Sequence, residues 1–280
     1  MINKFQKKLI PAIITVIALL SHFISAEAKS KTSEPVNEKE FLTDVNHINL
    51  SARTAKNIKT VEELIKTKKP KAVYIEQWIL AEKGNETLLQ KLHKLTHKYD
   101  TKLYLFIGRD SWFGRKGLIN TLAALDQYGD HIDGIILKTQ PNKINVWKDN
   151  LNFQAQILNQ MLDAYSAIYI EAKKRNKQFI VDFPFWFSDY QGPKKGFSEN
   201  VCDYADKVIF LIDDIEKLEK LDIKWNDVTC PYNIDLTKHA SLLSDDDVND
   251  IYKVIKSKLT FYANFNGFIV DSDSKVDFKE

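Results

Sequence analysis

The sequence predicts a single-domain (β/α)8 TIM barrel over residues 45–280, and two features lead to this prediction. Short segments rich in β-branched and aromatic residues alternate with segments of helical periodicity. Continuous apolar runs such as Val208–Ile212 are typical of parallel strands buried on both faces. A doubly wound open sheet is the alternative. It normally carries a glycine-rich phosphate turn after its first strand, and the sequence has none there.

The expected strands are short, and each ends near polar or turn-forming residues. In chain order they are Val45–Leu50, Ala72–Trp78, Leu103–Ile107, Ile132–Thr139, Phe179–Phe183, Val208–Ile212, Asp227–Tyr232 and Phe265–Val270.

Helices are expected between these strands. Val61, Leu64 and Ile65 share one helical face and follow a capping box formed by Thr60 and Glu63. Helical spacing also links Leu88, Leu89, Leu92 and Leu95, and further on Ile157, Leu158, Met161, Leu162 and Tyr165.

Two patterns resemble metal sites, but each has a simpler interpretation, so neither a metal nor another cofactor is expected. His93 and His97 are spaced like zinc ligands on a helix, but Lys94 stands where such motifs have Glu, and a solvated outer face is favoured. The acidic run Ser244–Asp247 is best explained as an N-cap whose carboxylates face the positive end of a helix dipole.

The first 28 residues have the pattern of a secretory signal peptide. A basic start is followed by the apolar run Leu9–Ser25 and by the small-x-small site Ala26-Glu27-Ala28. An uncleaved membrane anchor is the alternative, but the run is short and contains Pro11. We therefore expect an exported protein, periplasmic or secreted, with no membrane attachment after cleavage. Residues 29–44 are polar and are expected to form a linker.

Composition excludes several classes of protein. The net charge of +2 gives no reason to expect nucleic acid as a partner. Two cysteines are too few for a disulfide scaffold. Cys202 and Cys230 are expected as two separate buried thiols, with a disulfide in an oxidising compartment as the alternative. The sequence leaves the oligomeric state open.

In a barrel of this kind the functional residues lie at the carboxyl ends of the strands and in the loops that follow. Four tryptophans also lie at or soon after the expected strand ends. A sugar can stack on a flat aromatic face and form hydrogen bonds to the polar groups beside it, so this combination favours a carbohydrate site. Core packing is the alternative for any single tryptophan. The polar residues at these ends are Glu76, Arg109, Asp110, Lys138, Gln140, Asp182, Asp213, Asp214, Asp235 and Asp271, and the tryptophans are Trp78, Trp112, Trp147 and Trp186. The expected substrate-binding residues are Trp78, Arg109, Trp112, Trp186, Asp214, Tyr232 and Asp271.

The fourth expected strand carries a family resemblance. Residues 133–141, Asp-Gly-Ile-Ile-Leu-Lys-Thr-Gln-Pro, resemble the D-G-x-D-x-D-x-E segment of glycoside hydrolase family 18, the chitinase-like barrels, and a bacterial branch reading D-G-I-H-L-D-x-E-P. Residues 181–187 are similar to that branch's I-P-F-W segment, and residues 211–214 lie at the position of its M-x-Y-D segment. The resemblance implies a barrel with a carbohydrate site. It extends over nearly the whole chain after the signal peptide, although each motif alone is weak.

The departures from this motif, which begins at Asp133, predict a degenerate catalytic site. Gln140 stands where the family has its proton-donating Glu, and Lys138 replaces the Asp that orients the substrate's acetamido group. Asp213 replaces a Tyr, Asp214 matches the family's Asp, and Asp271 stands where a Trp is common. An amide cannot donate the proton that the leaving oxygen needs, and an ammonium opposes the positive charge of the transition state.

Two functions of different class remain. A third alternative is a barrel that binds another protein and has no sugar site. The first is a non-catalytic carbohydrate-binding protein on a glycosidase-like barrel. The second is an active glycoside hydrolase whose carboxylates have moved to Glu76, Asp182 and Asp213, with Lys138 anchoring an acidic sugar. A structural salt bridge with Lys138 or Arg109 is the alternative role for Glu76 and Asp182.

Overall fold

The computed structural model describes residues 45–85, 87–147, 151–185, 187, 197–212, 228–237 and 264–273. The expected signal peptide and linker lie outside these residues, as does the acidic run Ser244–Asp247. The barrel belongs to a compact unit that spans residues 41–280.

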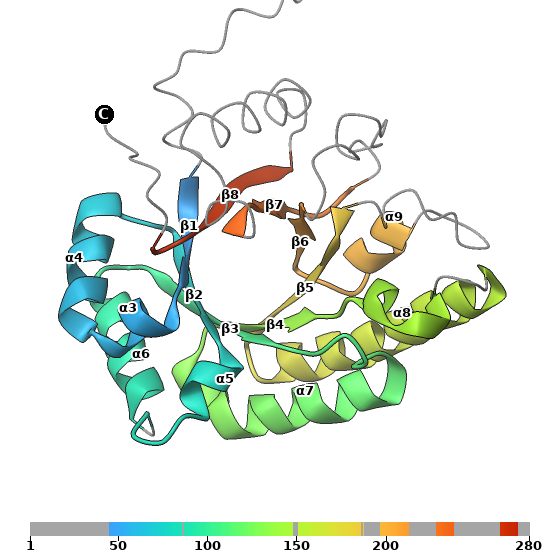
Figure 1. Ribbon diagram of the computed structural model, residues 1–280, viewed down its shortest axis with the longest axis horizontal. Coiled ribbons are helices and arrows are strands. Elements are labelled where there is room, and N and C mark those ends of the chain that lie inside the picture. Colours follow the sequence, from blue (N-terminus) through green and yellow to red (C-terminus); the bar gives the residue numbers. More distant parts are fainter. Residues whose placement is uncertain are drawn as a thin grey trace, which may run out of the picture. The chain divides into compact units, whose positions relative to one another are not determined.

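The described strands form a closed parallel barrel in the order β1 to β8, which confirms the predicted fold (Figure 1). Every neighbouring pair is parallel, including β1 with β8, so no strand edge is left open. The strands are β1 Val45–Leu50, β2 Ala72–Glu76, β3 Lys102–Ile107, β4 Gly134–Lys138, β5 Gln178–Pro184, β6 Lys207–Leu211, β7 Tyr232–Asp235 and β8 Phe265–Asp271.

Helices follow the strands on the outside of the ring, and α7 and α8 pack against each other (Figure 1). None of the described helices is both long and apolar enough to cross a membrane. The α-helices are α3 Ala52–Lys56, α4 Ile58–Lys68, α5 Gln77–Leu80, α6 Leu88–Lys98, α7 Gly114–Tyr128, α8 Leu151–Lys174 and α9 Phe197–Cys202. The 3-10 turns are η1 Gly129–His131, η2 Pro141–Lys143 and η3 Asn145–Trp147.

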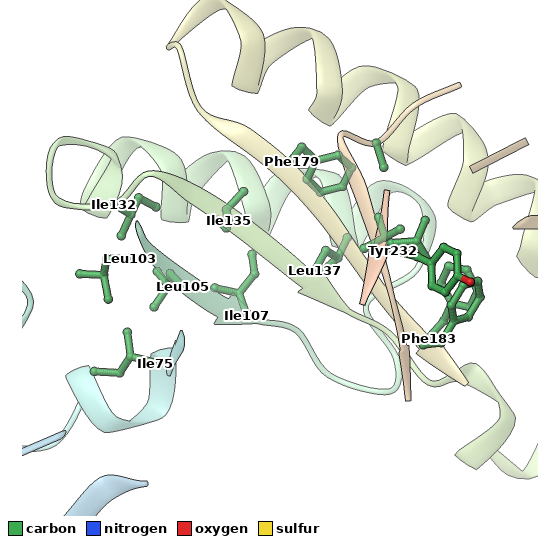
Figure 2. Close-up of a cluster of buried hydrophobic side chains, with 14 of the residues drawn as sticks. Ile75, Leu103, Leu105, Ile107, Ile132, Ile135, Leu137, Phe179, Phe183 and Tyr232 are labelled. Carbon is green, nitrogen blue, oxygen red and sulfur yellow. The ribbon is translucent and has the colours of Figure 1, made fainter. Parts of the chain in front are cut away.

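Side chains alternate between the two faces of the barrel wall. Outward-facing residues such as Leu105 and Leu137 belong to the core between strands and helices (Figure 2). Their inward neighbours fill the barrel axis with a second, smaller apolar cluster. That inner cluster consists of Ala72, Tyr74, Tyr104, Phe106, Ile136, Ile180, Ile209 and Ile269.

The amino end of the barrel is closed by polar contacts. Inside it, the buried ring of His47 is hydrogen bonded to the Tyr74 hydroxyl at 2.7 Å and to the Asn266 amide at 3.2 Å. Burial, followed by the charges of Lys207 and Lys71, lowers the pKa of His47 to about 3, so the ring stays neutral. The filled interior leaves the carboxyl end of the barrel as the place for a ligand.

Two aspartates fasten neighbouring strands at this amino end. The carboxylate of Asp133, just before β4, accepts a hydrogen bond from the Leu103 N–H at 2.8 Å, and the Asp133 N–H donates to the Leu103 carbonyl at 2.8 Å. Asp206, just before β6, makes the same double contact with Phe179 of β5. Asp133, the first residue of the family-like motif, is therefore a structural residue at the end of the barrel opposite the carboxyl ends of the strands.

Two local predictions were wrong. The seventh strand runs over Tyr232–Asp235 and not over Asp227–Tyr232, since Pro231 has no N–H to donate and lies before the strand. The capping box at Thr60 is also wrong, because α4 begins one turn earlier. Asn57 is its N-cap, and its side-chain oxygen accepts a hydrogen bond from the Thr60 N–H at 3.3 Å.

The two cysteines form a disulfide, so the expectation of separate thiols was wrong. Cys202 ends α9, whereas Cys230 precedes β7 and does not lie in a strand. The bond ties the segment before β6 to the segment before β7, across 28 positions of the sequence.

Candidate functional site

Four charged side chains meet at the carboxyl end of the barrel, and we call them the mouth cluster: Glu76, Lys138, Asp182 and Asp235. Glu76, Lys138 and Asp182 each follow a residue of the inner cluster by two positions, and Asp235 follows the buried Asn233 by two, so strand alternation turns all four toward the barrel axis. Glu76 ends β2, Lys138 ends β4, Asp182 lies near the end of β5 and Asp235 ends β7. Side chains from four different strands thus converge at one end of the barrel.

Lys138 and Asp182 form the centre of the mouth cluster. The two residues are register partners on β4 and β5, and the Lys138 Nζ lies 3.8 Å from the Asp182 Oδ2. The Asp182 side chain is 0% exposed, whereas that of Lys138 is 30% exposed. This ion pair matches the structural alternative considered for Asp182, although 3.8 Å is too long for a hydrogen bond.

Neither carboxylate oxygen of Asp182 has a hydrogen-bond partner among the described residues. Burial raises the pKa of Asp182 to about 7, opposed by Lys138 and reinforced by Asp235 and Glu76. A buried carboxylate without donors is costly, so the ionised form depends on the positive charge of Lys138.

Lys138 keeps its charge in this environment. Burial disfavours the ammonium, but the carboxylates of Asp182, Asp235 and Glu76 outweigh it and raise the pKa of Lys138 above its usual value. The Nζ also lies 5.3 Å from the centre of the Phe106 ring, within the range of a cation–π contact. Lys138 is therefore a fixed positive charge among carboxyl groups.

Glu76 and Asp271 complete the acidic character of this end. Burial, only partly offset by Lys138, raises the pKa of Glu76, and Asp235 adds to the effect. Asp271 ends β8, and burial raises its pKa despite a 2.8 Å hydrogen bond from the Asp273 N–H. Both groups therefore hold protons more tightly than a solvated carboxylate does.

Asp235 interacts electrostatically with all of these groups, yet it was not among the residues expected to be catalytic or to bind substrate. It is buried, its Oδ1 accepts a hydrogen bond from the Thr237 N–H at 2.8 Å, and its charge acts on Glu76, Lys138 and Asp182. Sequence reasoning placed the seventh strand several residues too early, so Asp235 fell beyond its expected end. The signal that identifies it is the alternation Tyr232-Asn233-Ile234-Asp235, with polar residues on one face.

Gly108 allows the loop after β3 to pass close to the backbone at the end of β4. It has a φ of +130°, and a Cβ added there would overlap the carbonyl oxygen of Lys138. The loop continues to Arg109, which is exposed, and to Asp110, whose carboxylate lies 3.9 Å from the Lys143 Nζ. In the described residues Arg109 therefore pairs with neither Glu76 nor Asp182, in contrast to Lys138.

The motif residue Gln140 is buried. It is 3% exposed, and its backbone carbonyl oxygen accepts a hydrogen bond from the Lys143 N–H at 3.0 Å at the start of η2. The position that resembles the family's acid therefore carries an amide that is shielded from solvent.

The tryptophans divide into different roles. Trp78 lies on α5, two residues after Glu76, and is 56% exposed. Trp112 is partly buried against the outer core, and Trp147 is buried and stacked on Phe187 with ring centres 5.4 Å apart. Core packing thus accounts for Trp147, while Trp78 remains available to a ligand.

Tyr232 lies on the opposite face of the barrel wall from the mouth cluster. It belongs to the outer core, and its ring contacts those of Phe210 and Phe265 at centre distances of 5.6 and 5.8 Å. Its expected contact with substrate conflicts with this position, because alternation along β7 turns Asn233 and Asp235 inward. The remaining expected residues, Asp213, Asp214 and Trp186, lie outside the described residues.

Within the described ranges, no group of three or more His, Cys, Asp or Glu side chains is arranged to hold a metal ion. The mouth cluster can instead offer hydrogen bonds and charge: one ammonium that donates, and carboxyl groups that accept or exchange protons near neutral pH.

Comparison with known proteins gives a likeness of fold. An O-GlcNAc hydrolase variant from Thermobaculum terrenum superimposes with a TM-score of 0.51 at 8% identity, covering 81% of this chain and 55% of that chain. The C-terminal domain of a protein named as a chitinase in Desulfitobacterium hafniense has a TM-score of 0.49 at 8% identity, covering 69% of this chain and 66% of that chain. An aldolase from Escherichia coli has a TM-score of 0.48 at 10% identity, covering 84% of this chain and 80% of that chain.

No protein-family model and no curated protein matches the sequence. This chain spans just over half of the Thermobaculum protein. The class defined here is thus the TIM barrel, a fold shared by glycosidases and by enzymes of other kinds, and function must be argued from the site.

Proposed function

We propose that this barrel binds a carbohydrate at its carboxyl end without hydrolysing it by the family 18 mechanism. The observation that carries the proposal is the exposed indole of Trp78 on α5, two residues along the chain from Glu76 of the mouth cluster. A sugar presents apolar faces that stack on an indole and hydroxyls that bond to charged groups, and this end of the barrel offers both kinds of group.

The absence of family 18 catalysis is supported by two positions on and after β4. The amide of Gln140 has no proton to give, and the residue is buried. Lys138 keeps a positive charge at the mouth, where it would oppose an oxocarbenium-like transition state.

The experiment is a titration of the purified protein with a panel of soluble oligosaccharides, followed by calorimetry. Trp78→Ala should weaken binding about tenfold or more, the usual effect of removing an aromatic anchor. Ile119→Ala is the matched control, because Ile119 is an apolar side chain that is 53% exposed on α7 and belongs to none of the expected or observed site residues. Absence of binding to any sugar, or equal binding by both variants, would contradict the proposal.

The second candidate is a glycoside hydrolase with relocated carboxylates, Glu76, Asp182 and Asp213. The raised pKa of Glu76 favours it, since a general acid must hold its proton near neutral pH. A panel of aryl glycosides tests it: turnover that disappears in Glu76→Gln but persists in Asp163→Asn, a change on the exposed face of α8, would establish hydrolysis. No turnover of any glycoside leaves binding as the function.

We also propose that the protein works outside the cytoplasm. The Cys202–Cys230 disulfide supports this, because such bonds persist in oxidising compartments. Fractionation of expressing cells, with N-terminal sequencing of the exported form, tests the proposal. The expected new N-terminus is Lys29, and an intact chain retained in the cytoplasm would contradict it.

A further inference from the structure

The charge balance of the mouth cluster points to the chemical class of its ligand. One ammonium, on Lys138, faces the carboxyl groups of Glu76, Asp182 and Asp235, and Asp271 lies within electrostatic reach of Asp235. Lys138 is already held by these carboxyls, so it is a poor anchor for an acidic sugar. An acidic ligand would add to an excess of carboxyl groups, whereas a cationic ligand would stabilise their ionised forms.

Two further cations of the described residues, Arg109 and Lys143, follow the ends of β3 and β4. Lys143 acts on Asp182 but lies 3.9 Å from the carboxylate of Asp110 on the rim. The side chain of Arg109 is exposed on the loop after β3. Among the described residues, the excess of carboxyl groups over cations at the mouth is therefore not cancelled from the rim.

Asp182 provides the second, independent observation. It is fully buried, faces the barrel axis, and both of its oxygens lack a hydrogen-bond donor among the described residues. Buried polar atoms are nearly always hydrogen bonded, so a carboxylate with two unsatisfied oxygens indicates a missing donor. Among the described residues its ion pair is with Lys138, at 3.8 Å, a distance that leaves both oxygens without a hydrogen bond.

We infer that the carbohydrate bound at the mouth is an amino sugar whose amine is free and protonated. This inference rests on the proposed function and names the ligand class of the same site. A protonated amine brings one positive charge and three N–H donors to a group of carboxylates, and hydrogen bonds between charged partners are about twice as strong as neutral ones. An N-acetylated amine has no charge and a single N–H, so it cannot replace the missing cation.

A proton should leave the site when such a ligand binds. Glu76, Asp182 and Asp271 all have pKa values raised by burial, and neighbouring carboxyl groups add to the effect. A bound cation favours their ionised forms, so a proton held by the free protein is released, near neutral pH in the case of Asp182.

The test compares glucosamine oligomers with free amines against N-acetylglucosamine oligomers of the same length, by calorimetry on the purified protein near pH 6. We expect the free-amine oligomer to bind at least about tenfold more tightly, because a charge-assisted hydrogen bond contributes on the order of 1.5–3 kcal/mol. We also expect release of protons on binding, measured in two buffers of different ionisation enthalpy, for the free-amine oligomer alone. Glu76→Gln should abolish most of the preference, and Asp163→Asn should leave it unchanged.

Each outcome decides between the two levels of the proposal. Equal affinity for both oligomers would overturn the amino-sugar inference and leave carbohydrate binding in place. Equal weakening by Glu76→Gln and Asp163→Asn would show nonspecific attraction of a cation and would also overturn the inference. Failure of both oligomers, and of the wider sugar panel, would overturn the proposed function itself. Thermal unfolding of each variant establishes that it is folded before binding is measured.

Discussion

Replacing Asp182 by asparagine should change the pH dependence of stability more than any other isosteric change at the mouth. In the folded protein the pKa of Asp182 is about 7, against 3.8 for the carboxyl group in an unfolded chain. Because the folded-state pKa is raised, the folded state binds the proton more tightly. The resulting stabilisation is complete below the unfolded value and is lost as the pH rises through about 7.

The magnitude follows from these two values. At pH 5 the folded carboxyl group keeps its proton while the unfolded one has lost it, which stabilises the folded state by about 3 kcal/mol. At pH 8 both forms are ionised and almost none of this contribution is left. The asparagine side chain of the variant does not titrate. The unfolding free energy of the wild type minus that of Asp182→Asn should therefore be about 2–3 kcal/mol larger at pH 5 than at pH 8.

Urea unfolding followed by circular dichroism at these two pH values measures the effect. Asp163→Asn, which removes a carboxylate from the exposed surface of α8, is the control and should parallel the wild type. If the unfolding free energies of wild type and Asp182→Asn run parallel across this range, Asp182 is not the buried, proton-binding group that the geometry describes.

Three further perturbations test the surroundings of the site. Gly108→Ala should lower the unfolding free energy by about 2 kcal/mol or more in urea, because its Cβ would overlap the Lys138 carbonyl at a φ of +130°; an unchanged midpoint would contradict that close approach. Asp133→Ala should lower the unfolding free energy by about 1–3 kcal/mol, because it leaves the buried Leu103 N–H without its acceptor. Asp206→Ala should cause a similar loss, and sugar affinity should be unchanged in both variants. Altered affinity at normal stability would instead place Asp133 in the binding site. The double change Cys202→Ser and Cys230→Ser should lower the unfolding free energy by about 3–4 kcal/mol, the loop entropy expected for a separation of 28 residues; equal stability with and without a reducing agent would argue against the bond.

The family-like segment shows how a motif and its position can diverge. Residues 133–141 resemble a catalytic strand, but its first residue, Asp133, fastens β3 to β4 at the amino end, and Gln140 is buried. Lys138 alone of these reaches the mouth cluster. The chemistry of the site therefore follows from the lysine that departs from the family and not from the residues that match it.

Local patterns in the sequence determined the barrel itself. β-Branched runs such as Val208–Ile212 and helical spacing such as Leu88, Leu92 and Leu95 are properties of neighbouring residues, and they placed most of the strands and helices correctly. The same patterns placed Glu76 and Lys138 at strand ends, and the carboxyl ends of parallel strands meet at one end of a barrel. Failures occurred where a local signal was weak or had two meanings, as at Pro231 before β7 and at Asn57 before α4.

The tertiary structure decided which of these residues are partners. Closure of the barrel sets Lys138 in register with Asp182, brings Asp235 from β7 to the same charges, and joins Cys202 to Cys230. Barrel closure also decides which face of β7 is the inner one. Tyr232 faces the outer core and Asp235 faces the barrel axis, because strand register and not composition fixes which face a side chain occupies. Burial and mutual distance exist only in the folded chain. The raised pKa of Asp182, and the excess of carboxyl groups over ammonium groups among the described residues of the mouth, are therefore consequences of the fold.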